Sequence, residues 1–134
     1  VKDVDFGSSQ IVVRSGKGNR DRVTVLPAVL RDELAKHLLT VRDQHQRDLR
    51  EGAGWVELPL SLAREYPGRG REWGWQWFFP ARRIYHHRES GEHRRHHLHE
   101  TVVQNADRHA VLKSGIAKPA SSHTFRHTFA THLL

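Results

Sequence analysis

The sequence has no cysteine among its 134 residues, which excludes disulfide bonds and thiol chemistry and leaves the redox compartment open. It has no apolar run near the roughly 20 residues that a transmembrane helix requires, and no signal-peptide pattern. We therefore expect a soluble, cytoplasmic protein without a membrane partner. The chain also lacks an initial Met and stops inside an apparent helix, so we expect a piece of a longer protein.

Acidic residues are in the minority, with 15 Asp and Glu against 22 Lys and Arg, a formal charge of +7 and 12 His. This balance favours an anionic partner such as nucleic acid, although a merely soluble basic protein would carry the same charge. The length fits one domain or part of one.

The first half of the chain predicts a small antiparallel sheet followed by a helix. Residues 4–6, 11–13 and 23–26 are short β-branched or alternating runs typical of strands. Glycines at 16 and 18 supply the turn of a hairpin, with Lys17 near its tip, where most lysines are simply solvated. Pro27 begins a helix whose apolar stripe runs to about Arg50. We therefore expect an α+β fold, with the sheet packed against helices.

Residues 55–80 have a different composition, rich in aromatic residues and proline. A short helix is predicted at about residues 59–66. Trp73, Trp75 and Trp77 then alternate, which predicts an extended strand with three indoles on one face. We expect at least two of these indoles to pack the segment onto the domain. The alternative is a surface on which unpaired bases stack.

Residues 82–97 predict a basic hairpin with its turn at Ser90 and Gly91. Arginines suit phosphates and neutral imidazoles suit bases, so DNA is the favoured partner. The spacings of His93 with His97 and of His97 with His99 leave a metal site as the rival interpretation. Zinc sites more often include cysteines or an H-E-x-x-H helix, so we expect no metal and no cofactor. The basic and imidazole residues of this stretch are Arg82, Arg83, His86, His87, Arg88, His93, Arg94, Arg95, His96, His97 and His99.

Two helices are predicted at the C-terminal end. Residues 98–115 form the first, with Val102, Val103, Ala106, Ala110 and Val111 facing inward and Gly115 as its cap. The second begins at Ser121 or Ser122 and places Phe125, Phe129 and Leu133 on one face. His123, Arg126 and His127 converge on another face, where an Arg fork, an imidazole and a helix N-terminus suit a phosphate.

The motifs at the two ends resemble those of the tyrosine recombinases, or phage-type integrases. The string His-Thr-Phe-Arg-His-Thr-Phe-Ala-Thr-His-Leu-Leu is similar to the family box H-x-L-R-H-[ST]-x-A-[ST]-x-L-L. This resemblance implies that His123 and Arg126 lie around the scissile phosphate. The run Gly-Lys-Gly-Asn-Arg-Asp-Arg resembles the G-K-G-x-[KR]-x-R hairpin, which implies that Lys17 is the general acid on the 5′-oxygen and that Arg20 and Arg22 lie at the DNA.

The middle of the chain resembles the integron integrases within that family. The segment Leu-Pro-Leu-Ser-Leu-Ala-Arg-Glu-Tyr-Pro, followed by Trp-Gly-Trp and Phe-Pro, is similar to their extra insertion, and Arg-Arg-His-His-Leu-His-Glu-Thr matches their pattern. Those enzymes recombine gene-cassette sites folded from one DNA strand and recognise extrahelical bases. The further DNA contacts implied are Trp73, Trp75, Arg94, Arg95, His96, His97 and His127.

The resemblance implies that residues 1–134 are part of a tyrosine recombinase catalytic domain, with an integron-type insertion at about 55–80 and a basic hairpin at about 82–97. In this family a Tyr attacks DNA to give a 3′-phosphotyrosyl bond and a free 5′-hydroxyl, within a tetrameric synapse. The first catalytic Arg should precede Val1 and the nucleophile should follow Leu134, because Tyr66 and Tyr85 lie in the wrong segments. We therefore expect the chain alone to be inactive. A non-catalytic nucleic-acid-binding module and, less favoured, a His-rich metal-binding protein remain as alternatives.

Overall fold

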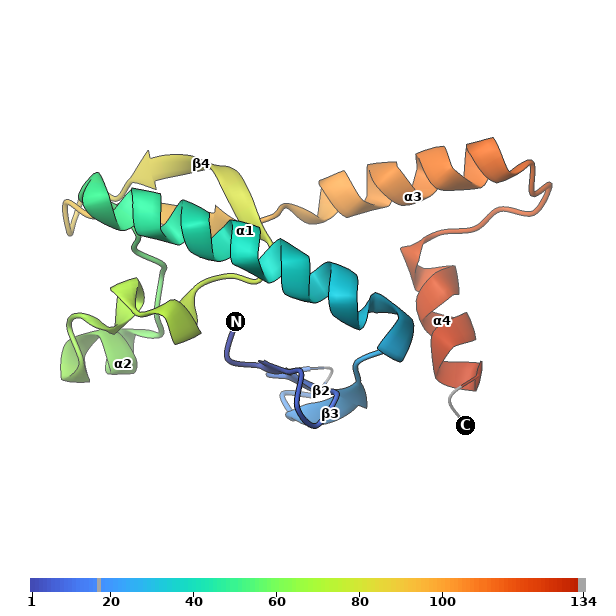
Figure 1. Ribbon diagram of the computed structural model, residues 1–134, viewed down its shortest axis with the longest axis horizontal. Helices are drawn as coiled ribbons and strands as arrows, with labels where there is room; N and C mark the ends of the chain where they lie inside the picture. The colour runs from blue at the N-terminus through green and yellow to red at the C-terminus, as the bar shows by residue number, and fades with distance from the viewer. Residues whose placement is uncertain (17, 133–134) are drawn as a thin grey trace. The chain divides into compact units, whose positions relative to one another are not determined.

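The computed structural model describes residues 1–16 and 18–132, and Lys17, Leu133 and Leu134 lie outside that range. The chain divides into two compact units, Val1–His97 and Leu98–Leu134. The first contains two small antiparallel sheets and helices, and the second contains two helices, so the α+β class is confirmed (Figure 1). No helix in the described ranges is long and apolar enough to cross a membrane.

The first sheet has the order β1-β2-β3 and is antiparallel throughout. Its strands are β1 (Val4–Asp5), β2 (Gln10–Val13) and β3 (Arg22–Val25), in agreement with the predicted runs. Val12 lies opposite Val23 in the ladder. Leu26 follows β3 directly and is the most buried hydrophobic residue in the described part of the chain. Its N–H donates to the carbonyl of Ser9.

Helix α1 (Arg31–Arg50) is the long helix of the first unit and follows a 3₁₀ turn, η1 (Ala28–Leu30) (Figure 1). It ends at Arg50 as predicted. Asp32 and Glu33 lie in its first turn and Arg47 and Arg50 in its last, an arrangement that complements the helix dipole. Its buried residues are Val41, His45 and Asp48, which follow one another at helical spacing.

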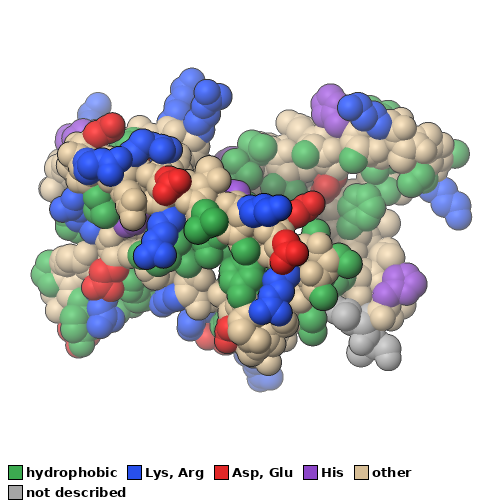
Figure 2. Space-filling model, viewed as in Figure 1, with side chains coloured by type: hydrophobic (Ala, Val, Ile, Leu, Met, Phe, Trp, Pro, Cys, Tyr) green, Lys and Arg blue, Asp and Glu red, His purple; other side chains and the backbone are tan. Residues whose placement is uncertain are grey.

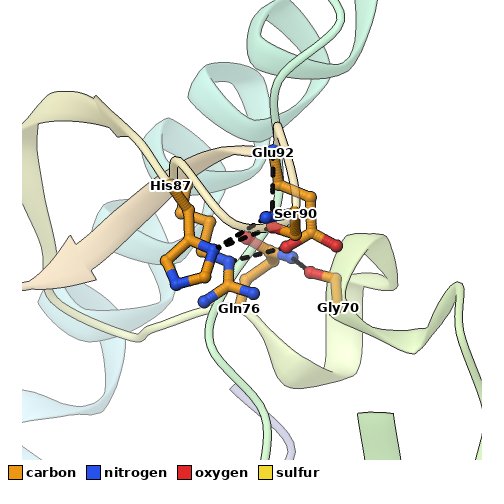
Figure 3. Close-up of polar contacts among 6 residues, drawn as sticks. Gly70, Gln76, His87, Ser90 and Glu92 are labelled. Atoms are coloured by element: carbon orange, nitrogen blue, oxygen red, sulfur yellow. Dashed lines mark hydrogen bonds and ion pairs between the residues drawn. The ribbon is translucent and has the colours of Figure 1, made fainter. Parts of the chain in front are cut away.

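Residues 55–80 contain α2 (Leu60–Glu65), close to the predicted short helix, and two 3₁₀ turns, η2 (Arg69–Arg71) and η3 (Trp73–Trp75). The predicted Trp strand is therefore wrong. The segment turns back on itself, with the buried Gln76 amide donating to the carbonyls of Gly54 and Glu72, both at 3.2 Å. The same amide donates to the Gly70 carbonyl at 3.0 Å (Figure 3). The alternation of the tryptophans in the sequence could not reveal these hydrogen bonds, which accompany a bent chain and not an extended one.

The predicted basic hairpin is confirmed as β4 (Pro80–His86) and β5 (His93–His97), an antiparallel pair. Its turn is closed by two backbone bonds, from His87 N–H to the Glu92 carbonyl and from Gly91 N–H to the His87 carbonyl, both at 2.8 Å. Gly91 has φ of 72°, a conformation that favours glycine. The His87 Nδ1 and Ser90 Oγ atoms lie 2.9 Å apart beside the turn (Figure 3).

The second unit consists of α3 (Glu100–Ser114) and α4 (Ser122–His132). Gly115 ends α3 in the left-handed conformation, as predicted. The Ser122 hydroxyl bonds to the Asp107 carboxylate and so ties α4 to α3. The predicted inward stripe is wrong, since Val102 is 50% and Val103 47% exposed. Two helices alone cannot enclose such a stripe, and apolar side chains remain visible on this unit (Figure 2).

Candidate nucleic-acid interface

The β4–β5 hairpin presents an aromatic step on one face. The rings of Tyr85 and His96 lie 4.5 Å apart with an interplanar angle of 11°, which is parallel stacking. His96 is exposed and Tyr85 half-buried, so the imidazole forms the outer layer of the stack. An exposed, flat ring supported from below is the kind of surface on which an unpaired base can stack.

Arg94 lies on the same face of β5 and is largely covered, with 14% of its side chain exposed. Its Nε donates to a Glu92 carboxylate oxygen at 2.6 Å. Burial alone lowers the pKa of the Arg94 guanidinium, but bonds to Glu92 and Tyr85 together raise it. The Arg94 guanidinium is therefore already engaged by Glu92 and Tyr85 within the hairpin, and any contact with a phosphate would have to compete with these bonds.

Arg95 points to the opposite side, where it holds the hairpin to α1. Its Nε and Nη2 donate to both carboxylate oxygens of Asp48 at 2.9 and 2.8 Å, and its Nη1 donates to the carbonyls of Ala81 and Arg82. Arg95 is 8% exposed and Asp48 is 6% exposed. The predicted phosphate contact does not fit this burial, and Arg95 is a structural residue.

The three alternating indoles each make packing contacts within the first unit, in agreement with the expectation that at least two of them are packing residues. Trp73 lies 5.9 Å from the ring of His45, and Trp75 lies beneath the Lys2 ammonium at 3.3 Å. The Trp77 indole N–H donates to the Arg95 carbonyl, and its ring meets His97 edge-on at 5.1 Å. All three remain partly exposed, so each retains an accessible edge.

The hairpin between β2 and β3 presents Arg20 and Arg22 as exposed side chains. Its loop is held by the bond from Asn19 N–H to the Gly16 carbonyl at 2.8 Å and by that from Ser15 N–H to Asp21 at 2.9 Å. Lys17, the predicted general acid, lies outside the described residues.

The second unit carries the other predicted catalytic residues on α4. Ser121 caps the helix, because its hydroxyl and that of Thr124 exchange bonds with each other's backbone N–H groups. His123 lies in this first turn and His127 in the next, and their Nε2 atoms are 2.9 Å apart. Arg126 is exposed on the same turn. The helix therefore places the three residues on one stripe, spaced i, i+3 and i+4, as predicted. The direct contact between the two imidazoles is an addition to that prediction.

Three buried polar residues of the first unit were missed from the sequence: His45, Asp48 and Gln76. A signal existed for two of them, because residues 34, 38, 41, 45 and 48 continue one helical stripe inward. A carboxylate on such a stripe indicates a buried cationic partner. His45 is buried beside Trp73, and this burial lowers the pKa of its imidazole, against the raising influence of the Arg71 hydrogen bond and of Asp48.

Comparison with known proteins gives one consistent family. The family model described as "Phage integrase family" matches residues 1–134. A protein of Escherichia coli and one of Pseudomonas aeruginosa, both named "Integrase/recombinase", are each 43% identical to this chain over all 134 residues. The chain spans 40% of the length of each of these curated relatives.

Proposed function

Because the chain belongs to the phage integrase family, we propose that it supplies DNA-binding and phosphate-activating residues to a tyrosine recombinase that breaks and rejoins DNA at specific sites. The observation that carries this proposal is the grouping of His123, Arg126 and His127 on one exposed stripe at the capped N-terminal end of α4. A guanidinium, imidazole donors and the end of a helix dipole together favour a pentacoordinate phosphate that gains negative charge.

In the proposed reaction, a tyrosine hydroxyl attacks a backbone phosphate and the 5′-oxygen leaves as a hydroxyl. Arg126 and His123 would stabilise the charge on the non-bridging oxygens, and Lys17 would protonate the leaving oxygen. The charge is balanced by protein side chains, so the step itself needs no metal ion. The product is a 3′-phosphotyrosyl bond, which a second 5′-hydroxyl reverses on another strand.

We propose that the 134-residue chain alone does not form this covalent bond. Its two tyrosines both lie in the first unit and serve other contacts. Tyr85 stacks on His96, and Tyr66 ends α2 with the Arg69 guanidinium 3.9 Å from its ring. A suicide DNA substrate, which traps the covalent intermediate, tests this directly. A denaturant-resistant protein–DNA species mapped to Tyr66 or Tyr85 would refute the assignment.

The catalytic assignment is tested in the complete recombinase by Arg126→Ala. Loss of one preorganised charge donor should slow cleavage on the order of 10²-fold or more. Lys113→Ala is the control, because this exposed basic residue belongs to the same unit but lies in the last turn of α3. If Arg126→Ala cleaves at the unaltered rate while DNA binding persists, Arg126 is not part of the active site.

A finer proposal concerns the DNA substrate. We propose that the hairpin recognises cassette sites folded from a single DNA strand, with an extrahelical base stacking on the His96 and Tyr85 step, within a tetrameric synapse. The support is the exposed imidazole, its stacked tyrosine and the neighbouring His97 on Trp77. A non-catalytic nucleic-acid-binding module would use the same surface, and only the adduct experiment on the complete protein separates the two.

This substrate proposal predicts selective loss of binding. Changing His96 and His97 together to Ala should weaken binding to a DNA hairpin with extrahelical bases by tenfold or more, since stacking contributes roughly 1–3 kcal/mol per base. Binding to a matched duplex should barely change. The control pair Arg82→Ala and Arg83→Ala removes exposed cations, so it should weaken both DNAs alike and reduce the salt dependence. If the histidine variant loses the same affinity for both DNAs, the base-recognition proposal fails and the hairpin is a basic arm without base specificity.

A further inference from the structure

The two imidazoles of α4 face each other closely enough to share a single bound atom. Their Nε2 atoms are 2.9 Å apart, and their rings meet at 86° with centroids separated by 4.4 Å. Both side chains are exposed. In such a contact one nitrogen carries the proton and the other accepts it, so at least one lone pair points into the space between the rings.

We propose that His123 and His127 form a two-histidine chelate for a borderline divalent cation such as Zn²⁺. Bonds of about 2.0–2.1 Å at a tetrahedral angle place two ligating nitrogens roughly 3.3 Å apart. The rings therefore need to separate by only a few tenths of an ångström, which a small side-chain rotation provides. Helical i, i+4 spacing also relates the two histidines of the H-E-x-x-H zinc motif, although the Glu of that motif is absent here.

Other histidine groups fit less well. His93 and His97, whose spacing suggested a metal site, lie four residues apart on an extended strand, which separates their positions by roughly 13 Å. His86 and His93 pair across the hairpin with ring centroids 5.0 Å apart and tilted by 52°. This pair is the closest rival, because two cross-strand imidazoles can also converge on one ion.

The chelate has two protein ligands, so water or an anion completes the tetrahedron. In the described residues no group of three His, Cys, Asp or Glu side chains is placed to hold a metal ion. Arg126 directly precedes His127, and its positive charge opposes the cation. A bound ion would occupy the nitrogen with which His123 would donate to phosphate. Provided that the proposed function is correct, the metal and the scissile phosphate therefore compete for His123.

The binding test uses the 134-residue chain and Zn²⁺ alone, without DNA. Calorimetry gives affinity, and histidine-ring NMR identifies which imidazoles are perturbed. His123→Ala and His127→Ala should each weaken binding on the order of tenfold or more, since losing even an outer-shell partner costs 10–100-fold. Arg126→Gln should tighten binding about threefold by removing a like charge. Alanine favours helix, so far-UV circular dichroism should show an intact α4 in each variant.

Two controls distinguish this site from the remaining histidines. His132→Ala changes an exposed imidazole on the same helix and should leave the affinity unaltered. The double variant His86→Ala and His93→Ala removes the rival pair and should also leave it unaltered. The proposal is overturned if either α4 variant binds Zn²⁺ like the parent chain, or if the hairpin double variant abolishes saturable binding.

The competition is tested separately in the complete recombinase. Zn²⁺ should inhibit cleavage in the parent enzyme, and His127→Ala should need about tenfold more Zn²⁺ for the same fractional inhibition of its own rate. If the chain binds Zn²⁺ at this pair but cleavage is insensitive to it, the chelate stands and the placement of His123 at the phosphate fails.

Discussion

The two compact units of the chain hold their polar residues in different ways. In Val1–His97, an ion pair, an amide and an imidazole are buried together with the core residues Leu26, Val41, Ala53 and Val56. In the second unit, none of the described residues 98–132 is buried, and Phe125 and Phe129 are 46% and 41% exposed. The hairpin surface of the first unit is thus held by interior bonds, whereas the α4 residues are placed by a cap, by contacts along one helix and by the bond from Ser122 to Asp107 of α3.

This difference can be measured because the two units have separate reporters. All four tryptophans, at positions 55, 73, 75 and 77, lie in the first unit. Tryptophan fluorescence therefore reports unfolding of the first unit, and amide hydrogen exchange in α4 reports the second. If the two units unfold independently, a substitution in one unit should change only the reporter of that unit.

The largest expected effect is that of Asp48→Ala. The variant leaves the Arg95 guanidinium buried without its carboxylate, which should lower the free energy of unfolding of the first unit by about 3–5 kcal/mol. Chemical denaturation followed by tryptophan fluorescence measures the change. Asp43→Ala, an exposed carboxylate on the same helix, is the control and should change stability little. Equal midpoints for the two variants would mean that the buried pair does not hold the hairpin.

Gln76→Leu should have the next largest effect. Its amide donates to the carbonyls of Gly54, Gly70 and Glu72, of which the last two also accept from the backbone N–H groups of Val56 and Trp75. The substitution therefore removes the donor to the buried Gly54 carbonyl, and such a loss costs roughly 1–3 kcal/mol. The same fluorescence assay applies, with Gln46→Leu on the exposed side of α1 as the control. If Gln76→Leu is as stable as the parent, the Gln76 side chain is not needed for the 3₁₀ turns η2 and η3.

The sequence predicts most elements of both units but not the interactions that fix them. Short β-branched runs separated by glycines define β1, β2 and β3, because local preference and the turn agree. The end of α1 and the β4–β5 turn are also local features. Arg95 is different, because its partner Asp48 lies 47 residues away and nothing in the Arg-rich run distinguishes it from Arg94. Long-range partners therefore decide which basic residues are buried in the first unit and which remain exposed.

The same reasoning explains the outcome at the candidate site. The convergence of His123, Arg126 and His127 follows from helical spacing and was predictable. The contact between the two Nε2 atoms depends on side-chain rotation and was not. The alternation of Trp73, Trp75 and Trp77 predicted a strand, but the segment forms a 3₁₀ turn whose neighbour Gln76 donates to the Gly70 carbonyl. This longer-range bond outweighs the local two-residue pattern.

Ser121→Ala tests the second unit and should cost about 1 kcal/mol of local helix stability, because the cap bond to Thr124 is lost. Amide exchange at Thr124 and Phe125 should quicken by about fivefold, which corresponds to that free energy. Tryptophan fluorescence melts should stay unaltered. Ser61→Ala in α2 is the matched control for an exposed serine of the first unit. A shift in the tryptophan melt would show that the two units unfold together.

The smallest expected effect is the pH dependence that His45 gives to the first unit. Burial lowers the pKa of the folded imidazole below its ordinary value of 6.5, while the Arg71 hydrogen bond and Asp48 offset part of that shift. The unfolded chain therefore binds the proton first as pH falls, so stability should decrease below about pH 6.5 and level off below the folded pKa. Denaturation of the parent chain at pH 8 and at pH 5, followed by tryptophan fluorescence, should show the decrease. His45→Gln should flatten the profile, whereas His86→Gln, an exposed residue of the same unit, should reproduce the parent profile. A parent profile that is already flat, or one that His86→Gln flattens equally, would remove His45 as its source.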